Sequence, residues 1–334
     1  PVVDAMKVLE IRQMLRYGNL GRLIVKTAAC LQPRGFAIDI LLLYNRNRAG
    51  LLGLDAAALP DVHPLLADAQ QQGVRAWQTM DDGPLSLRPL LSIWKAVRRE
   101  RYDVLHTHDL KSNVFGLLAG KISGIPVVAT AHGYPRAIRR NDIYRRLDLL
   151  ALRLCRHVVC VSDGLRRELA AAGLDPRRMT VVYNGIDMGE LLGRASLSQS
   201  SVRHELGLSA DAPIVMAVGR LSAEKGHVYL VRAWKRVLAA SPDACLLIVG
   251  DGPLRAQLQE EASNLGIAGR VRLLGFRENA PALMAQCDAV VVPSLGEALG
   301  NVVLEGMALG KPVIGAAAGG IPEIIGDGGA GVLV

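Results

Sequence analysis

The sequence of 334 residues predicts an α/β protein of two doubly wound, Rossmann-like domains that face each other across a cleft. Three observations predict this fold class. The length suits about two domains. Half of the residues are apolar, which is enough for two large cores. Short apolar runs alternate with helical patterns along the chain, and this alternation favours parallel sheets with helices on both faces.

Thirteen short β-rich runs carry the alternation. In the first half they are "MKVLEI", "FAIDILLLY", "VRAWQT", "VLHTHD", "VVATAH", "HVVCVS" and "MTVVYNG". In the second half they are "PIVMAVG", "ACLLIVG", "VRLLGF", "AVVVPS", "PVIGA" and "GVLV". Many are continuous apolar runs, which is typical of strands covered on both faces. Helical patterns lie between most of them, for example over 87–101, 227–240 and 254–265.

The series is interrupted once, by "GRASLSQSSVRHELGLSADAP" at 193–213. This stretch is rich in serine and small residues and contains no strand pattern. We therefore predict a first domain at 1–192, a linker at 193–213 and a second domain at 214–334. Ligands of such sheets bind beyond the carboxyl ends of strands, at the point where the strand order reverses, so polar residues just after strands are the candidates for function.

Charge and composition exclude several classes of protein. Residues 1–195 hold 28 Lys and Arg against 18 Asp and Glu, whereas residues 196–334 hold 11 against 13. The basic first half favours phosphate-bearing ligands or anionic lipid head groups, or is simply a solvated arginine-rich surface. Aromatic residues make up only 4%, which argues against nucleic acid as a partner.

The cysteines and the hydropathy pattern bear on location. The five cysteines are scattered without CxxC spacing, so neither a disulfide framework nor a zinc site is expected, and a cytoplasmic location is the default. No apolar run reaches the ~18 residues that a membrane-spanning helix needs. No secretory leader is visible, and the chain begins with Pro1.

Two cations follow the first strand of the second half, in "IVMAVGRLSAEKGHVYLV". Arg220 comes directly after the strand and its glycine, and Lys225 lies near the start of the next helix. A helix N-terminus carries unpaired N–H groups and a partial positive charge, which suits a phosphate. With these two side chains it would form a diphosphate clamp. The alternative is two solvated cations on a loop.

Two glutamates stand eight residues apart in "SLGEALGNVVLEGMALGKPVIGA". Glu297 lies in a predicted loop, and Glu305 lies about one turn into a helix that starts near Asn301. If the stretch were all helical, the gap would span about 12 Å, too far for a hydrolytic carboxylate pair. It suits two hydroxyl-bearing groups joined by a diphosphate, with Gly300 leaving room for phosphates near the N–H groups of Asn301 and Val302. A surface Glu297 and a helix-face Glu305 are the alternative.

At this point the chain resembles the family 4 glycosyltransferases. "VGRLSAEKG", "VGDGP", "LLGF", the two glutamates and "GGIPEII" follow one another in the family's order. The resemblance implies the GT-B fold and a retaining, nucleotide-sugar-dependent hexosyltransferase. It implies that Gly219, Arg220 and Lys225 bind the donor diphosphate, that Glu297 contacts the transferred sugar, and that Glu305 contacts the ribose.

The resemblance also assigns a role to His132, which ends "VVATAHG". The family has a histidine here, near the sugar's C6 hydroxyl and the reacting centre. Without the resemblance, a strand-end histidine bonded to backbone would be the better interpretation. His106 and His108 have metal-like spacing in "LHTHD", but no third ligand is evident. No Asp-x-Asp occurs, so we expect no metal and no cofactor, the nucleotide sugar being a substrate.

The fit is poorer near both ends of the chain. Relatives carry a Gly-Gly pair after the first strand, where this chain has Gly18 and Gly21 apart in the predicted loop "RQMLRYGNLGRL". Gly21 and Arg22 are the candidate acceptor-side contacts. Relatives also continue past "GGAGVLV", so we expect the second domain to lack its last helices.

An arginine-rich helical pattern precedes the sixth strand, in "RAIRRNDIYRRLDLLALRLCRH". Its apolar residues at helical spacing are Ile143, Leu147, Leu150, Ala151 and Leu154. The arginines that crowd its start are Arg136, Arg139, Arg140, Arg145 and Arg146. The ordinary interpretation is a core-facing helix with solvated arginines. The alternative is a basic amphipathic helix on an anionic membrane, which the family's lipid-linked acceptors favour.

The sequence therefore predicts a transferase that moves a sugar from a nucleotide sugar to a hydroxyl of a glycan or lipid-linked acceptor, in cell-surface polysaccharide or glycolipid synthesis. We expect a cytoplasmic protein that contacts the membrane peripherally. The alternatives are a nucleotide-sugar epimerase on the same fold, a non-catalytic nucleotide-sugar-binding subunit, and a nicotinamide-dependent oxidoreductase. The absence of a G-x-G-x-x-G after an early strand counts against the last.

Overall fold

The computed structural model describes residues 5–15, 17–46, 59–133, 142–196, 201–326, 329 and 331–334. The chain divides into two compact units, Pro1–Tyr183 and Asn184–Val334. Each of the thirteen runs predicted as strands contains a strand, and each unit is a parallel sheet flanked by helices, so the predicted fold class is confirmed.

The first unit contains a seven-stranded sheet in the order β3-β2-β1-β4-β5-β6-β7, in which every pair is parallel. Its strands are β1 (Met6–Gln13), β2 (Phe36–Tyr44), β3 (Ala76–Met80), β4 (Val104–Thr107), β5 (Val127–Ala131), β6 (His157–Cys160) and β7 (Met179–Val181). Strand β2 shows why the runs fold in this way: its residues Ile40–Tyr44 are all buried, as in a strand covered on both faces.

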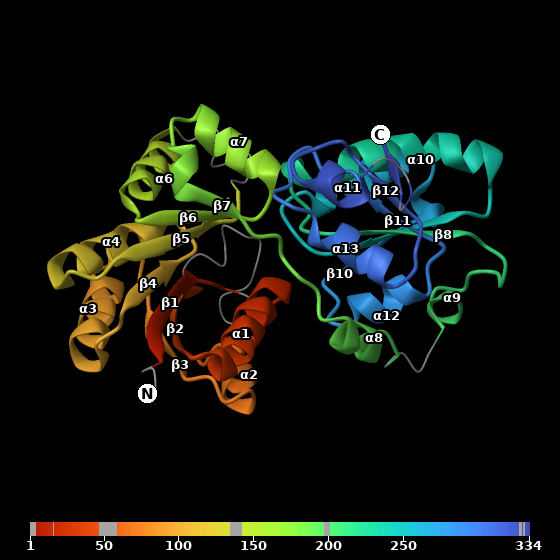
Figure 1. Ribbon diagram of the computed structural model, residues 1–334. Helices are drawn as coiled ribbons and strands as arrows, with labels where there is room; N and C mark the ends of the chain where they lie inside the picture. The colour runs from red at the N-terminus through yellow and green to blue at the C-terminus, as the bar shows by residue number, and fades with distance from the viewer. Residues whose placement is uncertain are drawn as a thin grey trace. The chain divides into compact units, whose positions relative to one another are not determined.

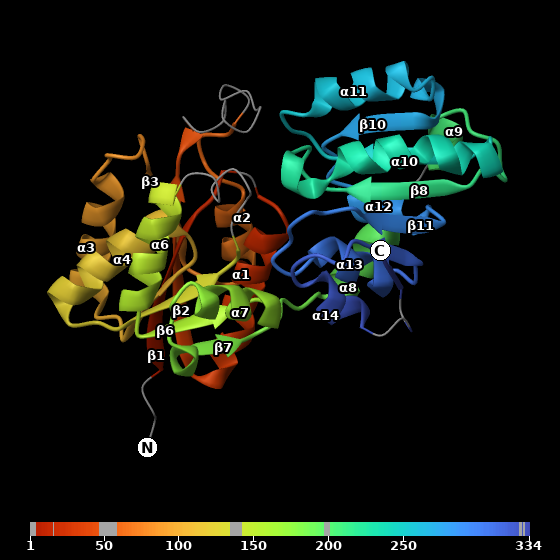
Figure 2. The same cartoon turned by 90° about the horizontal axis from the view of Figure 1, so that it is seen from above.

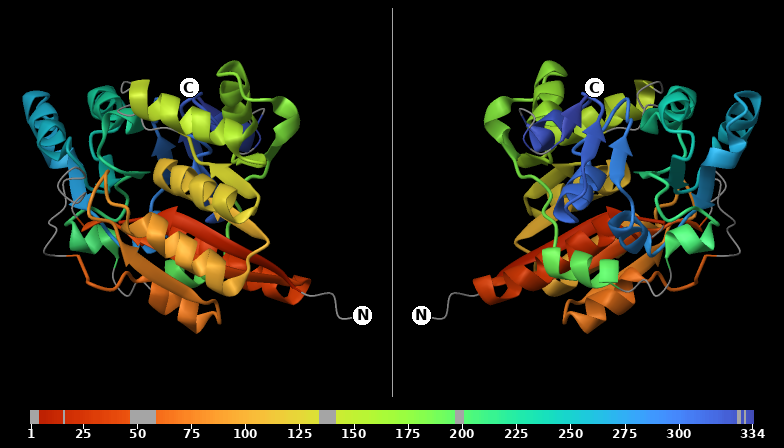
Figure 3. Two further views of the ribbon diagram at one scale, coloured as in Figure 1. Left: turned by 90° about the vertical axis from the view of Figure 1, so that its left-hand side faces the viewer. Right: turned by 90° about the vertical axis from the view of Figure 1, so that its right-hand side faces the viewer.

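Helices cover both faces of this sheet (Figure 1). They are α1 (Asn19–Leu31), α2 (Leu65–Gln71), α3 (Arg88–Glu100), α4 (Leu110–Ser123), α6 (Asp142–Leu154) and α7 (Asp163–Ala171). Helices α1 and α2 pack together, and α3, α4 and α6 lie side by side over the opposite face (Figure 3). Helix α4 begins with a capping box, in which Asp109 accepts from the N–H of Ser112 and the Ser112 hydroxyl accepts from the N–H of Asp109.

The second unit contains a six-stranded parallel sheet in the order β10-β9-β8-β11-β12-β13. Its strands are β8 (Ile214–Val218), β9 (Cys245–Val249), β10 (Val271–Gly275), β11 (Ala289–Val292), β12 (Val313–Gly315) and β13 (Val332–Leu333). Its helices are α8 (Met188–Ser196), α9 (Val202–Glu205), α10 (His227–Ala240), α11 (Arg255–Asn264), α12 (Ala280–Ala285), α13 (Asn301–Ala308) and α14 (Ile321–Ile325). Figure 2 shows α10 and α11 beside β8 and β10.

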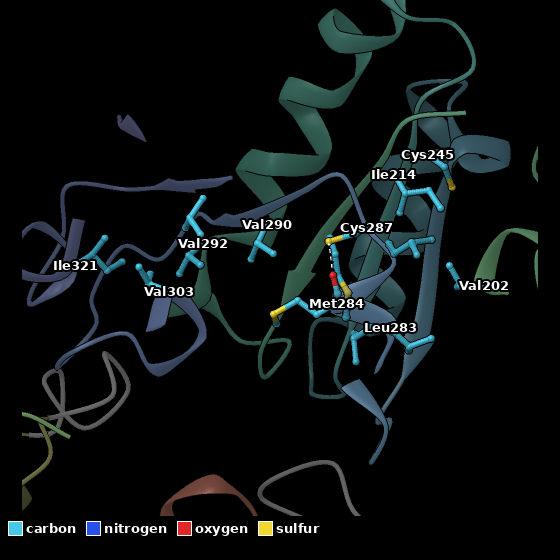
Figure 4. Packing of buried hydrophobic residues seen from close by; sticks show 14 of the residues in the cluster. Val202, Ile214, Cys245, Leu283, Met284, Cys287, Val290, Val292, Val303 and Ile321 are labelled. Atoms are coloured by element: carbon cyan, nitrogen blue, oxygen red, sulfur yellow. Dashed lines mark hydrogen bonds between the residues drawn. The ribbon is translucent and has the colours of Figure 1, made fainter. Parts of the chain in front are cut away.

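Two hydrophobic clusters hold this unit together, one on each face of the sheet. Alternate side chains of β9 enter them in turn: Leu247 joins the cluster under α12 and α13, and Leu246 joins the cluster under α10 and α11. Figure 4 shows the first cluster, in which Met284 of α12 packs near Val290 of β11. The strand backbones are thereby fixed, and with them the positions of the loops that leave their carboxyl ends.

Both sheets have the same strand order, and in both the order reverses between two central strands. In the first unit the reversal falls between β1 and β4, and in the second between β8 and β11. Connections from such neighbouring strands leave toward opposite faces, which opens a crevice at their carboxyl ends where ligands bind in this class of fold.

The boundary between the units differs from the predicted one. The predicted first domain extends to residue 192 and the predicted linker covers 193–213, whereas the compact units meet between Tyr183 and Asn184. Helix α8 packs against α12, and Val202 of α9 lies in the core cluster of the second unit. Leu191, just before the predicted linker, and Val202, within it, are buried and attach this part of the chain to the second unit. The serine-rich composition did not indicate these contacts.

The packing of helix α6 also differs from the preferred interpretation of its sequence. Ile143, Leu147, Leu150 and Leu154, predicted to face the core, are 68%, 47%, 51% and 64% exposed, and only Ala151 of the predicted set is buried. The residues that do face the core include Leu149 and Leu152, while Arg136, Arg139 and Arg140 lie outside the described residues. In the described ranges, no helix is both long enough and apolar enough to span a bilayer.

Candidate functional site

In the second unit, predicted site residues meet where the strand order reverses. Lys225 follows β8 and Glu297 follows β11, and the Lys225 Nζ lies 2.5 Å from the Glu297 Oε2. The hydroxyl of Ser294 also donates to the Glu297 Oε2, at 3.2 Å. Both charged side chains are largely shielded from solvent. Two separate sequence motifs singled out Lys225 and Glu297. These residues lie 72 positions apart and form one ion pair.

Arg220 lies on the same loop but is held by different partners. Its guanidinium forms an ion pair with Glu224 and donates from Nε to the Ser222 hydroxyl at 3.2 Å. Burial raises the pKa of Glu224, but the hydrogen bonds from Ser222 and Arg220 outweigh it and hold the pKa below its usual value. Glu224 is thus a fixed negative charge that orients Arg220, a role that the sequence did not reveal.

The start of α13 lies beside Glu297. Gly300 is the N-cap residue with a φ of 104°, and a Cβ there would lie 3.1 Å from Ile321, which explains a glycine at this position. The side-chain oxygen of Asn301 accepts from the Asn184 side chain at 3.1 Å. Among the backbone bonds of the described residues, neither Asn301 nor Val302 donates its N–H, as expected for the first turn of a helix.

Glu305 lies farther along α13 and is buried, with its carbonyl accepting from the N–H of Leu309. Glu297 precedes Gly300 and is not helical, so the segment between the two glutamates is not one continuous helix. The straight-helix span of about 12 Å therefore does not apply to this pair.

Backbone segments from different loops interlock around Glu297. The N–H of Gly320 donates to the Glu297 carbonyl at 3.2 Å, and the N–H of Leu295 donates to the Glu224 carbonyl at 2.8 Å. Gly319 has a φ of 58°, and a Cβ there would lie 1.6 Å from the Glu297 carbonyl oxygen. The carboxylate of Glu297 is thus placed by three loops in backbone contact, which is a rigid arrangement.

The sequence analysis missed two residues of this site. Asn184, which lies in the predicted run "MTVVYNG" and was given no role of its own, holds Asn301 at the start of α13. His227, the first residue of α10, is buried beside Gly219, and burial together with the neighbouring Lys225 lowers its pKa to about 4. No motif indicated a role for His227, and the run that contains Asn184 predicted only a strand.

In the first unit, polar side chains gather where the order reverses between β1 and β4. His132, which follows β5, lies with its Nε2 3.1 Å from the His108 Nδ1 and 3.3 Å from the Arg12 Nη1. The His108 Nε2 in turn lies 2.7 Å from the Glu10 Oε1. His132 therefore contacts other side chains rather than backbone alone.

The prediction that His106 and His108 lack a third partner is wrong. Glu10 stands opposite His106 in the β1–β4 register, and the three side chains offer ligand atoms within 4.8 Å of one another. These side chains also contact one another and their neighbours. The His106 Nε2 lies 2.7 Å from the Thr130 hydroxyl, His108 contacts Glu10 and His132, and the Arg12 cation adjoins the group.

The predicted acceptor-side residues Gly21 and Arg22 are not in a loop. They form the first turn of α1, where the N–H of Arg22 donates to the Gly18 carbonyl at 3.1 Å. A Cβ on Gly21 would lie 2.8 Å from the Tyr17 ring, and the Arg22 guanidinium lies 5.1 Å from the centre of that ring.

Comparison with known families and proteins gives concordant matches. Residues 20–190 match the family described as Glycosyltransferase Family 4, and residues 198–334 match that described as Glycosyl transferases group 1. The chain is 30% identical over 353 residues to the D-inositol 3-phosphate glycosyltransferase of Geodermatophilus obscurus, covering 95% of this chain and 74% of that protein.

A second relative and a solved structure extend the comparison. The UDP-Gal:alpha-D-GlcNAc-diphosphoundecaprenol alpha-1,3-galactosyltransferase of Escherichia coli is 29% identical over 239 residues, 68% of this chain. The match spans 61% of that enzyme, less than two thirds of its length. The crystal structure of Anabaena HepE in complex with UDP-glucose superimposes with a TM-score of 0.79 at 25% identity, covering 98% of this chain and 85% of HepE.

Replacing Gly319 should show how tightly the Glu297 loop is held. Gly319 and Gly310 have similar φ angles, 58° and 68°, but the Gly310 position has open space where Gly319 faces the Glu297 carbonyl. Gly310→Ala should cost only the strain of a left-handed residue, about 1–2 kcal/mol. Gly319→Ala should lower the free energy of unfolding clearly more than Gly310→Ala does. Urea denaturation followed by the fluorescence of Trp234 measures both losses. Equal losses of stability in the two variants would show that the close approach of Gly319 to the Glu297 carbonyl has no effect on stability.

Proposed function

This chain belongs to glycosyltransferase family 4, and we propose on that basis that it is a retaining glycosyltransferase. It moves a sugar from a nucleotide-sugar donor to a hydroxyl of a glycan or lipid-linked acceptor. The observation that carries the proposal is the convergence of Lys225, Glu297 and the start of α13 at the β8–β11 reversal. This is the position at which doubly wound sheets bind nucleotides.

The roles that we propose for these residues follow from their charges. Lys225 and Arg220, with the N–H groups of Asn301 and Val302, would stabilise the negative charge that develops on the departing diphosphate. Glu297 would accept hydrogen bonds from the transferred sugar. A diphosphate would compete with Glu297 for Lys225, so that donor binding redistributes the ion pair seen here.

Three further roles complete the proposal. Glu305 would hold the ribose hydroxyls, and His132 would lie at the reacting centre. Same-face attack would retain the configuration of the sugar without a protein nucleophile. Because cationic groups already surround the diphosphate position, we propose that neither a metal nor another cofactor is required.

Lys225→Ala should lower the rate of nucleotide release from the sugar donor by about 10²–10³-fold, because it removes one aimed charge. Lys235→Ala is the matched control, since Lys235 is an exposed lysine on α10, outside the site. Both variants and the wild type are assayed in excess EDTA with UDP-, GDP- and ADP-sugars. Loss of wild-type turnover in EDTA that magnesium restores would refute the metal-free mechanism, and an unimpaired Lys225→Ala would refute the clamp.

The two glutamates should separate binding from transfer. Glu305→Gln should weaken nucleotide binding about tenfold to hundredfold, since hydrogen bonds to charged groups contribute about 1.5–3 kcal/mol. Glu297→Gln should keep nucleotide affinity but transfer slowly. Calorimetry with the nucleoside diphosphate and turnover of the corresponding sugar donor measure the two effects. If both variants bound nucleotide like the wild type, the ribose assignment would be wrong.

We further propose that α6 places the protein at the cytoplasmic face of an anionic membrane, in cell-surface polysaccharide or glycolipid synthesis. Its exposed stripe is defined above by Ile143, Leu147, Leu150 and Leu154, and the neighbouring helix α4 carries another exposed apolar residue, Ile122. The exposed Lys121 and Arg153 lie on the same two helices. The E. coli relative acts on an undecaprenol-linked sugar, which supports an acceptor presented by a membrane.

The membrane proposal predicts co-sedimentation with vesicles. The wild type should bind vesicles that contain phosphatidylglycerol, and binding should fall as salt screens the charges. The double variant Leu147→Ser, Leu150→Ser should lose binding without losing stability, because both side chains are exposed. Leu192→Ser, an exposed leucine on α8, is the control. Equal binding by the double variant would exclude α6 as the contact.

A further inference from the structure

Arg12 of the first unit is a charged side chain without an oppositely charged partner. It is the last residue but one of β1 and lies beside the point where the strand order reverses. In the part of the chain that the structure describes, its guanidinium has one hydrogen-bond partner, the His132 Nε2, which lies 3.3 Å from the Arg12 Nη1. No carboxylate of these residues forms an ion pair with it, and its Nε is enclosed without a partner.

The position of this charge is costly. Part of the Arg12 side chain is removed from water, and burial lowers its pKa from the ordinary value. The carboxyls of Asp109 and Glu10 oppose this effect through space without contacting Arg12. A charge removed from water is ordinarily paired with an opposite charge. The first unit thus maintains a cation whose counter-charge it does not supply, which is typical of a functional site.

The hydrogen bonds next to Arg12 explain why Glu10 does not neutralise it. A guanidinium can only donate, so the His132 Nε2 accepts and the neutral ring keeps its proton on Nδ1. The His108 Nδ1, 3.1 Å from the same His132 Nε2, must then donate as well, which leaves the His108 Nε2 without a proton. That atom lies 2.7 Å from the Glu10 Oε1, a contact that is favourable when the Glu10 carboxyl carries the proton.

The pKa shifts agree with this placement of protons. Burial, reinforced by the Arg12 charge, lowers the pKa of His108 and of His132 well below the usual range, so both rings are neutral. Burial raises the pKa of Glu10, which favours its neutral form. The Asp109 carboxylate accepts from two backbone N–H groups and is held by them. Neither acid therefore serves as a direct counter-ion of Arg12.

The unused donors of Arg12 suit a phosphate. The planar fork of a guanidinium matches the oxygens of a phosphate and binds them with charge-assisted hydrogen bonds. The His132 Nδ1–H adds a neutral donor beside the charge, since no partner is recorded for it among the described residues and it is not one of the enclosed atoms. The excess of Lys and Arg over Asp and Glu in residues 1–195, 28 against 18, favours the approach of anions.

We propose that Arg12 binds a phosphate group of the acceptor. This inference rests on the proposed function, in which the acceptor is a glycan or a lipid-linked sugar, and it narrows the acceptor to one that carries phosphate. A prenol-linked sugar joined through a diphosphate and a soluble sugar phosphate share this chemistry. His132, Glu10 and His108 are positioning residues for Arg12, because their hydrogen bonds orient its Nη1. The site lies within the first unit and requires no group of the second.

Histidine spectra test the site without any reaction. In protein labelled with ¹⁵N-histidine, long-range ¹H–¹⁵N spectra at neutral pH should show a neutral His132 ring with its proton on Nδ1, assigned with His132→Gln. Inorganic phosphate, added at constant ionic strength, should shift these signals in a saturable way, because it binds the guanidinium that contacts the ring. The shift should persist in Lys225→Ala, which removes a cation proposed for the donor diphosphate of the second unit.

Arg12→Gln, made in the Lys225→Ala protein, should weaken phosphate binding about tenfold to hundredfold, because it removes hydrogen bonds to a charged group. Arg34→Gln is the matched control and should leave binding unchanged. Arg34 is exposed on the 3₁₀ turn Gln32–Arg34, which precedes β2 at the opposite edge of the same sheet. A proton on the His132 Nε2, or a phosphate shift that survives Arg12→Gln, would overturn the proposal.

Stability separates a binding role of Arg12 from a structural one. In buffer without phosphate, Arg12→Gln should unfold at the same urea concentration as the wild type or at a higher one, because the variant no longer holds an unpaired charge away from water. A structural arginine would give the opposite result. A clearly lower midpoint for Arg12→Gln than for Arg34→Gln would therefore count against a site kept for a ligand.

Three probes identify the source of the phosphate, with the His132 shift of Lys225→Ala as the measure of binding. Tighter binding of geranyl diphosphate than of glucose 1-phosphate would assign a lipid-linked acceptor, and the reverse order would assign a soluble sugar phosphate. Geraniol, which lacks phosphate, should not bind, and binding as tight as that of geranyl diphosphate would overturn the site.

Turnover distinguishes failure of this site from failure of the proposed function. Phosphate binding that depends on Arg12, in a wild-type protein that turns over no sugar donor with any acceptor, would refute the function alone. Sugar transfer by the wild type, combined with phosphate binding that Arg12→Gln leaves unchanged, would refute the site alone.

Discussion

The structure depends on one topological constraint, the reversal of strand order at the centre of each sheet. Strands β1 and β4, like β8 and β11, lie side by side while their connections leave toward opposite faces. The connections diverge at the ends of such a pair, so polar side chains and helix N-termini can meet there. In both units the polar groups of interest are found at this place, although the sequence motifs that supply them are unrelated.

The polar groups at these reversal points contribute to the positioning of a ligand rather than to the stability of the fold. Moving Lys225 and Glu297 partly out of water costs free energy that their mutual attraction roughly offsets, as is usual for shielded ion pairs. The stability of the second unit comes from the two clusters that alternate side chains of β9 enter. Since the core and the site are built from different residues, isosteric changes such as Glu to Gln disturb chemistry more than folding.

The sequence was most informative where one local pattern decides the outcome. Continuous apolar runs such as β9 predicted their strands, and the motifs that follow β8 and β11 placed Lys225 and Glu297 near each other. It was least informative where a long-range neighbour decides. The spacing on α6 showed an apolar face but not that Leu150 is 51% exposed in the described structure. Glu10 is the one acid of β1, and its proximity to the histidines follows only from its register with His106, 96 positions away.

The two reversal points differ in the groups that they present. Arg220, Lys225 and the first turn of α13 make the second unit's crevice suited to a departing anion. The first unit's crevice holds neutral imidazoles between one arginine and one buried carboxylate. Burial and the neighbouring Arg12 charge make an additional positive charge unfavourable there, whereas burial favours the neutral form of the Glu10 carboxyl.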